Sequence, residues 1–384
     1  MRARIILFVF ISGIFLAACE KLSISEKDVD TFIANNTTAI SAELEGNVAI
    51  RTSSPVDYSV VFQCSKSEDF SPAYAIIVKE VVPDGEGNCL ATVSGLDPGT
   101  TYYFRLSVHW NNQEIHGETK SFRTLGIQTL LDTRKATGLE ETEARLNAYL
   151  SLSHIPYDKL DYGFFWGASD AVPDKQISCG EIKEDVISAP LTNLTKQTVY
   201  SYRAYVTIDG RTFLGEIKTF PTAPEGAVDL GFTGYFNESG EQYLFWSTRN
   251  LCEAGFVDSP EMEGDYYAWG EAEDAAGQIL GGSWRIPTSM DWRGLFECTL
   301  QWDTEKGMNG LRITGPNGKS IFLPAAGYRY QTSLNGKGST GGYWSSSLSS
   351  HTDSAIGFSF SSGGAQSTEF FRYYGLQIRP VWSY

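Results

Sequence analysis

An internal repeat with a period near 100 residues constrains the fold of this chain more than any other feature. Residues 102–108, with the sequence YYFRLSV, align with residues 200–206, YSYRAYV, at an offset of 98 residues. Two further matches keep that offset: Leu96 with Leu194, and residues 117–124 with residues 215–222. Ala42 and Ala144 match at an offset of 102 residues, which indicates a four-residue insertion in the second copy. A fixed offset of this size predicts tandem domains.

The repeated segments have the alternating pattern of half-buried β-strands. Apolar residues that would share one face of a sheet are Tyr102, Phe104, Leu106 and Val108, and polar residues fall between them. Turn signals separate such segments: Asp84-Gly85, Asp97-Pro98-Gly99 and Asp209-Gly210. The pattern predicts two β-sandwiches of about 100 residues each. We place them at residues 37–125 and 126–223.

Part of each copy resembles the fibronectin type III family, in which a tyrosine hydroxyl bonds back to the backbone across a corner. The first copy has the family's spacing at Leu96, Pro98, Thr100 and Tyr102. The second copy keeps Leu194, Thr198 and Tyr200 and has Lys196 in place of the proline. The resemblance implies immunoglobulin/fibronectin III-like sandwiches. We interpret them as spacers, with a binding module as the alternative, because a fold alone does not give a function.

The first 36 residues have the pattern of an exported, lipid-anchored protein. Arg2 and Arg4 precede an apolar run over residues 5–18, which at 14 residues is shorter than the about 20 that a spanning helix needs. We therefore predict a signal peptide at residues 1–18. Residues 16–19, LAAC, have the pattern of a bacterial lipobox and predict lipidation of Cys19. The alternative is an ordinary signal peptide with a chance cysteine. The polar residues 19–36 predict a tether.

Anchoring and charge limit the partners that we expect. The N-terminal lipid predicts a protein held on the outer membrane, and Glu20, directly behind the cysteine, favours display at the cell surface. A formal net charge of −16 argues against nucleic acid, because the phosphates would be repelled. With 13% aromatic residues and 38 glycines, the composition is typical of folded, turn-rich β structure and not of disorder.

Residues 224–384 form a third region, organised around residues 284–288, WRIPT. Thr288 and Asp291 have the spacing of a helix capping box, so we expect a helix to begin there. An apolar stripe at helical spacing would then face the core: Trp292, Leu295, Phe296 and Leu300.

Four ordered blocks in this region resemble the Fibrobacter succinogenes major paralogous domain family, FISUMP. The motif blocks are residues 281–288 (GGSWRIPT), 323–329 (LPAAGYR), 343–347 (YWSSS) and 375–381 (GLQIRPV), and two earlier segments, 246–250 and 266–271, fit the family's opening. That family is similar in fold to C-type lectins. The resemblance implies a mainly β chain in which two sandwiches precede an α+β C-type-lectin-like domain. We expect the tryptophans inside the blocks, Trp284 and Trp344, and the neighbouring Trp292 to be buried.

Signatures of catalysis and metal binding are missing from the sequence. The four histidines fall in no HExxH motif and beside no nucleophile motif, so we predict no enzymatic activity and no cofactor. Bridges between Cys64 and Cys89 and between Cys252 and Cys298 are open alternatives to buried free thiols. An acidic stretch over residues 258–274 fits no EF-hand; we predict a solvated loop there, with calcium binding as the alternative.

Aromatic residues give the one positive indication of a ligand, because their rings suit both the apolar faces of sugars and protein interfaces. The candidates for ligand contact lie at loop-like segment ends: Tyr266, Tyr267, Trp269, Tyr328, Arg329 and Tyr330. We interpret the protein as a non-catalytic lipoprotein that displays a lectin-like domain on a sandwich stalk, for adhesion or for binding a glycan or an envelope or host protein. The alternative is a structural component of an envelope complex with no soluble ligand. An enzyme ranks last.

Overall fold

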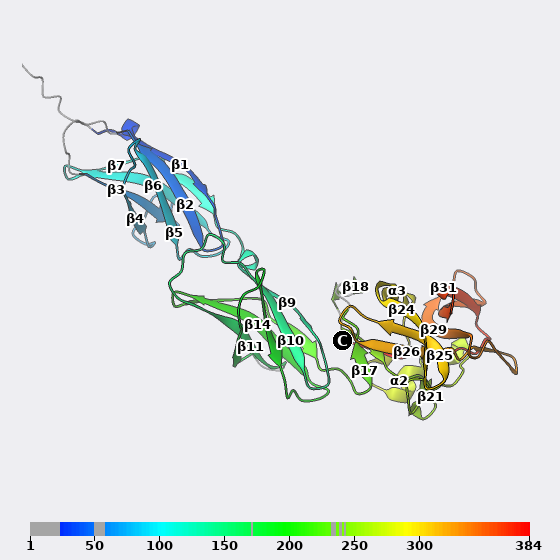
Figure 1. Cartoon of the computed structure of the whole chain (residues 1–384). Helices are drawn as coiled ribbons and strands as arrows, with labels where there is room; N and C mark the ends of the chain where they lie inside the picture. The colour runs from blue at the N-terminus through cyan, green and yellow to red at the C-terminus, as the bar shows by residue number, and fades with distance from the viewer. Residues whose placement is uncertain (1–23, 50–57, 170–171, 232–235, 238–239, 242) are drawn as a thin grey trace, which may run out of the picture. The chain divides into compact units, whose positions relative to one another are not determined.

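The computed structural model describes residues 24–49, 58–169, 172–231, 236–237, 240–241 and 243–384. The predicted signal peptide and Cys19 lie outside these residues. The chain divides into two compact units, Met1–Gly126 with Ser153–Pro156 and Ile127–Leu152 with Tyr157–Tyr384. It is mainly β, with antiparallel sheets in both units (Figure 1). Among the described residues, no helix has the length and apolar character that crossing a membrane requires.

The first unit is a β-sandwich. One sheet has the order β1-β2-β5, and the other has the order β4-β3-β6-β7, with β8 also paired to β6. The strands are β1 (Val29–Asn35), β2 (Ser41–Val48), β3 (Tyr58–Ser65), β4 (Ile77–Val81), β5 (Asn88–Ser94), β6 (Thr101–Trp110), β7 (Gln113–His116) and β8 (Lys120–Arg123). Apolar side chains from both sheets form one core, in which Leu44, Phe62 and Phe104 are fully buried.

The second unit begins with a sandwich of the same topology. Its sheets have the orders β13-β10-β9 and β12-β11-β14-β15, with β16 also paired to β14. The strands are β9 (Leu131–Thr137), β10 (Ala144–Leu150), β11 (Leu160–Ala168), β12 (Lys175–Ser178), β13 (Val186–Leu191), β14 (Val199–Ile208), β15 (Arg211–Leu214) and β16 (Lys218–Pro221). The repeat in sequence is therefore a repeat in topology, and the prediction of two tandem sandwiches is confirmed.

The residues that predicted the sandwiches lie where the pattern placed them. The four apolar residues of β6 that alternate from Tyr102 are at most 4% exposed. Tyr102 Oη accepts a hydrogen bond from Asp97 N at 2.9 Å, and Tyr200 Oη accepts one from Thr195 N at 2.9 Å. Each copy thus has a tyrosine that fixes the chain five residues upstream of it, although the second copy lacks the proline.

The N-terminal boundary of the first sandwich differs from the predicted tether at residues 19–36, because Val29–Asn35 forms β1 and pairs with β2. Thr31 is buried, and its Oγ1 accepts a hydrogen bond from Leu106 N at 3.0 Å. Thr133 does the same for Ala204 N at 3.1 Å in the second copy. Thr31 and Thr133 are 102 residues apart, which is the offset of the earlier alanine match. The repeat therefore begins nearer the N-terminus than the predicted boundary.

The rest of the second unit combines short helices with small antiparallel sheets. The helices are α1 (Trp269–Ala272), α2 (Ala275–Leu280) and α3 (Ser289–Gly294). One four-stranded sheet, of order β17-β20-β32-β23, joins β17 (Ala227–Asp229), β20 (Leu244–Ser247), β32 (Val381–Ser383) and β23 (Trp284–Arg285). Two three-stranded sheets consist of β24 (Thr299–Glu305), β25 (Met308–Thr314) and β26 (Ser320–Pro324), and of β29 (Thr340–Leu348), β30 (Ser354–Ser361) and β31 (Gly364–Phe371). The two-stranded pairs are β18 (Phe236–Asn237) with β19 (Gly240–Glu241), β21 (Leu251–Cys252) with β22 (Gly255–Phe256), and β27 (Tyr328–Tyr330) with β28 (Ser333–Asn335).

Helix α3 begins at the predicted capping box. Thr288 Oγ1 accepts a hydrogen bond from Asp291 N at 3.1 Å, and Asp291 Oδ2 accepts one from Thr288 N at 2.7 Å. Trp292 and Leu295 are buried as predicted. The stripe prediction is wrong for Phe296, which is exposed, and for the next position, Leu300, which lies in β24. The reason is that α3 ends at Gly294, so the helical spacing no longer applies beyond it.

A buried polar network joins several of the motif blocks. Arg379 has no exposed surface, and it donates to Asn250 Oδ1 at 3.0 Å, Ser247 O at 3.1 Å and Phe322 O at 2.8 Å. Asn250 Nδ2 in turn donates to Gln377 Oε1 at 2.7 Å and to Tyr343 Oη at 3.3 Å. Burial lowers the pKa of Arg379 to about 10. The blocks therefore hold the fold together. Trp344 is buried as predicted, whereas Trp284, which was also predicted to be buried, is only half-buried.

The sheet β29–β30–β31 lies between two hydrophobic cores. Tyr343, Phe358 and Phe360 extend from one face into the first core. On the other face, Trp344 and Ala355 enter a second core that also contains Trp269. The pairing of β29 with β30 extends to Thr340 and Ser361. The face of the sheet that packs on the second core therefore continues beyond that core. This continuation carries the candidate site.

Candidate ligand-binding groove

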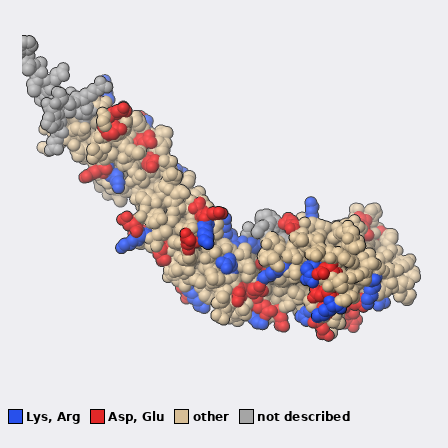
Figure 2. Space-filling view, viewed as in Figure 1, with Lys and Arg blue, Asp and Glu red and all other residues tan. Residues whose placement is uncertain are grey.

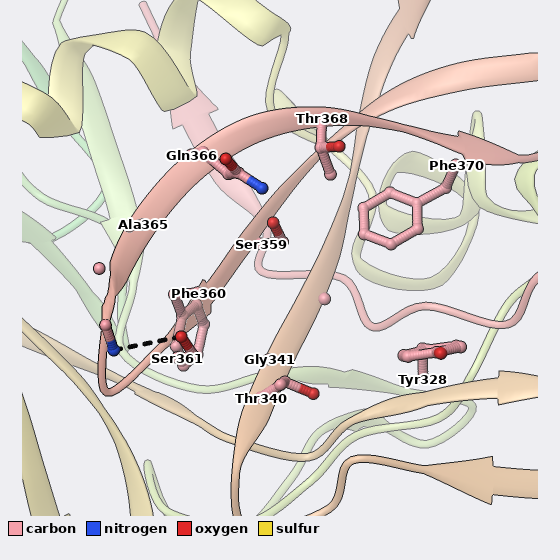
Figure 3. A pocket seen from close by; sticks show the side chains of 13 residues that line it. Tyr328, Thr340, Gly341, Ser359, Phe360, Ser361, Ala365, Gln366, Thr368 and Phe370 are labelled. Carbon is pink, nitrogen blue, oxygen red and sulfur yellow. Dashed lines mark hydrogen bonds between the residues drawn. The ribbon is translucent and has the colours of Figure 1, made fainter.

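The uncovered part of that sheet face is a groove with a volume of about 480 Å³ (Figure 3). We call it the β29–β31 groove. Its lining residues are Tyr328, Thr340, Gly341, Gly342, Ser359, Phe360, Ser361, Gly363, Gly364, Ala365, Gln366, Thr368 and Phe370. A volume of this size is in the range of pockets that take small organic ligands.

Strand register explains which side chains line the groove. Gly342, Ser359 and Gln366 are direct partners across the three strands, and two residues further along, on the same face, Thr340, Ser361 and Gly364 are partners. Residues directly opposite each other in an antiparallel pair share a face. Hydroxyl and amide side chains therefore gather on one face, and Figure 3 shows Ser359, Gln366 and Thr368 near one another over the strands.

Glycines keep the floor of the groove low. A Cβ added to Gly342 would lie 3.1 Å from Leu376 Cδ2, so Leu376, which packs on the same face of the sheet, leaves little room for a side chain there. Gly363 lies in the turn between β30 and β31, and Gly364 is the first residue of β31. A Cβ at Gly364 would meet no atom within 4 Å, so nothing closes this end of the groove.

The groove is uncharged. Among the described residues that line it there is no carboxylate, amine, guanidinium, imidazole or thiol. Three polar side chains of its floor, Ser359, Gln366 and Thr368, make no side-chain hydrogen bond to any other part of the described chain. Groups of this kind can bind neutral polar ligands through hydrogen bonds. On the face of the molecule shown in Figure 2, acidic and basic side chains are interspersed.

An aromatic cluster adjoins the other end of the groove. Its centre is Tyr374, whose ring lies 5.5 Å from Tyr328, 6.5 Å from Phe370, 5.4 Å from Tyr330 and 5.2 Å from Tyr373, centroid to centroid. Tyr328 and Phe370 also line the groove. The outer rings are open to solvent: Tyr330 is 40% exposed and Tyr373 58%. The cluster and the groove therefore form one continuous surface.

The structure brings two of the six predicted ligand contacts to this surface, and a third, Arg329, lies between them in sequence but faces the other side of β27. Tyr328 lines the groove and Tyr330 belongs to the cluster. Arg329, between them on β27, is exposed, and its guanidinium lies 5.0 Å from the ring centroid of Tyr266. All three come from the hairpin β27–β28.

The other three predicted contacts point into the fold. Trp269 was predicted to be a surface residue, and this is wrong: it is 5% exposed and its indole nitrogen donates to Ser345 O at 3.0 Å. Tyr266 is half-buried and donates from Oη to Ala326 O at 2.6 Å. Tyr267 is also half-buried, and burial raises the pKa of its phenol. The segment looked loop-like because α1 is only one turn long, but its aromatic rings pack on the second core.

Sequence reasoning missed the residues 370–374, FFRYY, which supply most of the cluster. Their signal was a run of four aromatic residues in five positions immediately before a motif block. It also missed the groove floor, because Ser359 and Gln366 come together only through the register of β30 and β31.

Acidic residues of the stretch 258–274 are held by separate local partners. Glu261 pairs with Lys306 at 2.9 Å, and Glu263 pairs with Lys337 at 2.8 Å. Asp265 accepts a hydrogen bond from Glu253 N at 2.8 Å. Within the part of the chain that the structure describes, no group of three histidine, cysteine or acidic side chains is arranged to hold a metal ion.

The five cysteines of the described residues are free thiols. Cys64 and Cys89 are buried in the first sandwich, and burial raises their pKa values to about 12 and about 11. Of the two alternatives that the sequence left open, the structure has the free thiols.

One comparison with known proteins matches the last part of the chain. A family model described as a domain of unknown function, DUF8237, matches residues 301–381, a range that includes every residue of the groove. No curated protein matches this chain. The resemblance to FISUMP, the C-type-lectin-like fold and the lipidation of Cys19 stay predictions.

Several solved structures are similar to the sandwiches. The sensor domain of the anti-sigma factor RsgI4 in Pseudobacteroides cellulosolvens is 24% identical over 26% of this chain and 93% of its own, with a TM-score of 0.21. A segment of two fibronectin type III domains from chicken tenascin is 12% identical over 50% of this chain and 97% of its own, with a TM-score of 0.22. At such TM-scores the likeness carries no argument beyond the β-sandwiches that the strand pairing already shows.

Proposed function

We propose that this protein is a non-catalytic lipoprotein of the cell envelope whose C-terminal region binds a glycan. In this proposal Cys19 carries the lipid that holds the chain on the outer membrane, the two sandwiches are a stalk, and the ligand is met at the cell surface. The lipobox pattern, the tandem repeat and the groove support the three parts separately.

The observation that carries the binding proposal is the continuity of the β29–β31 groove with the aromatic cluster. Sugar rings have apolar faces that stack on aromatic side chains and hydroxyl groups that pair with polar side chains. Tyr328 and Phe370 supply ring faces at the end where Gln366, Ser359 and Thr368 supply hydrogen-bonding groups. Exposed aromatic rings gathered beside a polar floor are typical of a binding surface.

We also propose that the C-terminal region has a C-type-lectin-like fold, as its resemblance to FISUMP implies. One feature that supports this is the pairing of its last strand, β32, with β20 near its start. The order of short helices and small sheets, α+β in character, supports it as well.

A glycan array probed with the full chain tests the proposal, once with calcium and once with chelator. We expect binding that survives chelation, because the described groove lining has none of the carboxylates on which calcium sites usually depend. Binding lost on chelation would move the site to the acidic stretch 258–274. Absence of binding to any glycan would contradict the proposal.

One observation favours a second candidate function, assembly with another envelope protein. Tyr330, Phe371 and Tyr373 are each at least 40% exposed, and exposed tyrosine and phenylalanine rings are enriched at protein interfaces. Crosslinking in intact cells separates the two functions. A single envelope partner recovered repeatedly, together with a silent glycan array, would favour assembly.

A further inference from the structure

We infer that the β29–β31 groove binds the interior of an extended, uncharged polysaccharide rather than a terminal or charged sugar. The inference rests on the proposed glycan binding and narrows it to one ligand class. The shape of the groove and the chemistry of its lining support it independently.

The groove follows the strands instead of ending in a pocket. On β31 its lining extends from Gly364 to Phe370, six residue steps or roughly 20 Å of strand. Gly363 and Gly364 at one end have no side chains that would block a chain leaving the groove. At the other end, ring contacts through Tyr374 connect the lining to the exposed Tyr330 and Tyr373. A ligand that is longer than the groove can therefore continue at both ends.

The lining selects against charge. A carboxylate or sulfate in the groove would lose hydration without meeting a cation, because no lining residue of the described chain is charged. Neutral sugar hydroxyls both donate and accept, and so do the hydroxyls of Ser359 and Thr368 and the amide of Gln366. Those three side chains have no partner within the described protein, so a sugar hydroxyl replaces only water.

Binding of the full chain to defined polysaccharides tests the inference. The neutral probes are xylan, mannan and mixed-linkage glucan, each also as oligosaccharides from the disaccharide upward, and the charged probes are polygalacturonate and alginate. We expect affinity for a neutral probe to rise at least tenfold from the disaccharide to the polymer. We also expect less than a twofold change in affinity between about 50 mM and about 500 mM salt.

A matched pair of variants locates the site on one face of β31. The groove variant Gln366→Ala/Thr368→Val removes an amide and a hydroxyl from the lining, and we expect at least tenfold weaker binding. The control variant Ser367→Ala/Glu369→Gln changes the alternate positions of the same strand, which face the other side. We expect it to bind within twofold of the unchanged chain. Thermal unfolding of both variants shows whether the strand remains folded, and the comparison uses the less drastic single variant Thr368→Val if it does not.

The remaining outcomes distinguish failure of the proposed function from failure of the inference. If no glycan binds, the proposed function fails. If disaccharides bind as tightly as polymers, or if only the charged probes bind, glycan binding holds and the inference fails. If the control variant weakens binding more than the groove variant does, the site lies elsewhere on the molecule.

Discussion

Two glutamines in the C-terminal region show two uses of the same side chain. Gln377 is fully buried; its Nε2 donates to Gly264 O at 3.1 Å and its Oε1 accepts from Asn250 Nδ2 at 2.7 Å. Gln366 is exposed in the groove, and its amide has no partner among the described residues. Buried polar groups are almost always hydrogen-bonded within the protein, and their geometry is then fixed by it. Gln377 therefore stabilises the fold, while the amide of Gln366 is available to bind a ligand.

The same difference separates the motif blocks from the groove. Arg379, Asn250 and Gln377 belong to blocks or to the family's opening, and they bond to one another or to buried backbone. Most groove residues lie outside the blocks; Tyr328, at the end of residues 323–329, is the exception. The residues of the motif blocks therefore do not mark the groove that we propose as the binding surface. Stability and binding should respond to different substitutions.

The largest effect is expected from Arg379→Met, which removes the donors of the buried network and keeps much of the side-chain volume. Asn250 Oδ1 and two backbone oxygens would be left without the guanidinium that they now bind. We expect the C-terminal region to lose about 3 to 5 kcal/mol of unfolding free energy. Calorimetry that resolves the transition of this region measures the loss.

The control for that experiment is Arg293→Met, at an exposed position of α3. It should change the unfolding free energy by no more than about 0.5 kcal/mol. A loss below about 1 kcal/mol for Arg379→Met would contradict the view that this network specifies the fold.

Features that depend on residues close together in the sequence, or on a constant offset, could be predicted. The repeat, the alternation on β6 and the capping box of α3 rest on neighbouring residues or a constant offset, and the structure confirms them. Thr31 and Thr133 also lie at the offset of the repeat. β1 was nevertheless missed, because residues 29–35 lie in a polar segment with no sustained apolar alternation.

The site was less predictable because strand register and packing decide it. Nothing near Ser359 in the sequence indicates that it lies opposite Gly342 and Gln366. Trp269 has the flanking residues of a surface loop, and only the packing of α1 on the second core buries it. Tyr328 and Tyr330 were predicted because they lie at a loop-like segment end, which is a local signal, and the structure places them on the short hairpin β27–β28.

The second largest effect is expected in binding, from Tyr330→Ala/Tyr373→Ala. Both rings are largely exposed, so the unfolding free energy should change by only about 0.5 kcal/mol per substitution. Affinity for a bound glycan should fall about tenfold, as expected for the loss of stacking worth about 1.4 kcal/mol. Isothermal titration measures the affinity. Tyr74→Ala, at a 51% exposed tyrosine of the first sandwich, is the control and should leave it unchanged.

A smaller effect on stability is expected from Tyr102→Phe and Tyr200→Phe. Each removes one hydroxyl that accepts a backbone hydrogen bond at 2.9 Å and leaves the buried ring in place. Each sandwich should lose about 1 kcal/mol of unfolding free energy, visible as a lower urea midpoint with an unchanged slope. Glycan affinity should not change. A shared loss of binding would mean that the sandwiches contribute to the site, against their assignment as a stalk.

The smallest effect is a pH dependence in the first sandwich, where His116 is a half-buried polar group that has a hydrogen-bond partner within the fold. Its Nδ1 lies 2.8 Å from the hydroxyl of the buried Ser107. Partial burial, together with the positive charge of Arg105, lowers the pKa of His116 below its usual value of about 6.5. The unfolded chain therefore binds this proton more readily, so the stabilisation is complete above about pH 6.5 and is lost as the pH falls through the folded pKa. Urea midpoints of the first sandwich measured downward from pH 7 should show this loss, and His116→Gln should reduce it. If His116→Gln shows the same pH dependence as the unchanged chain, other titrating groups cause the loss of stability and His116 does not contribute to it.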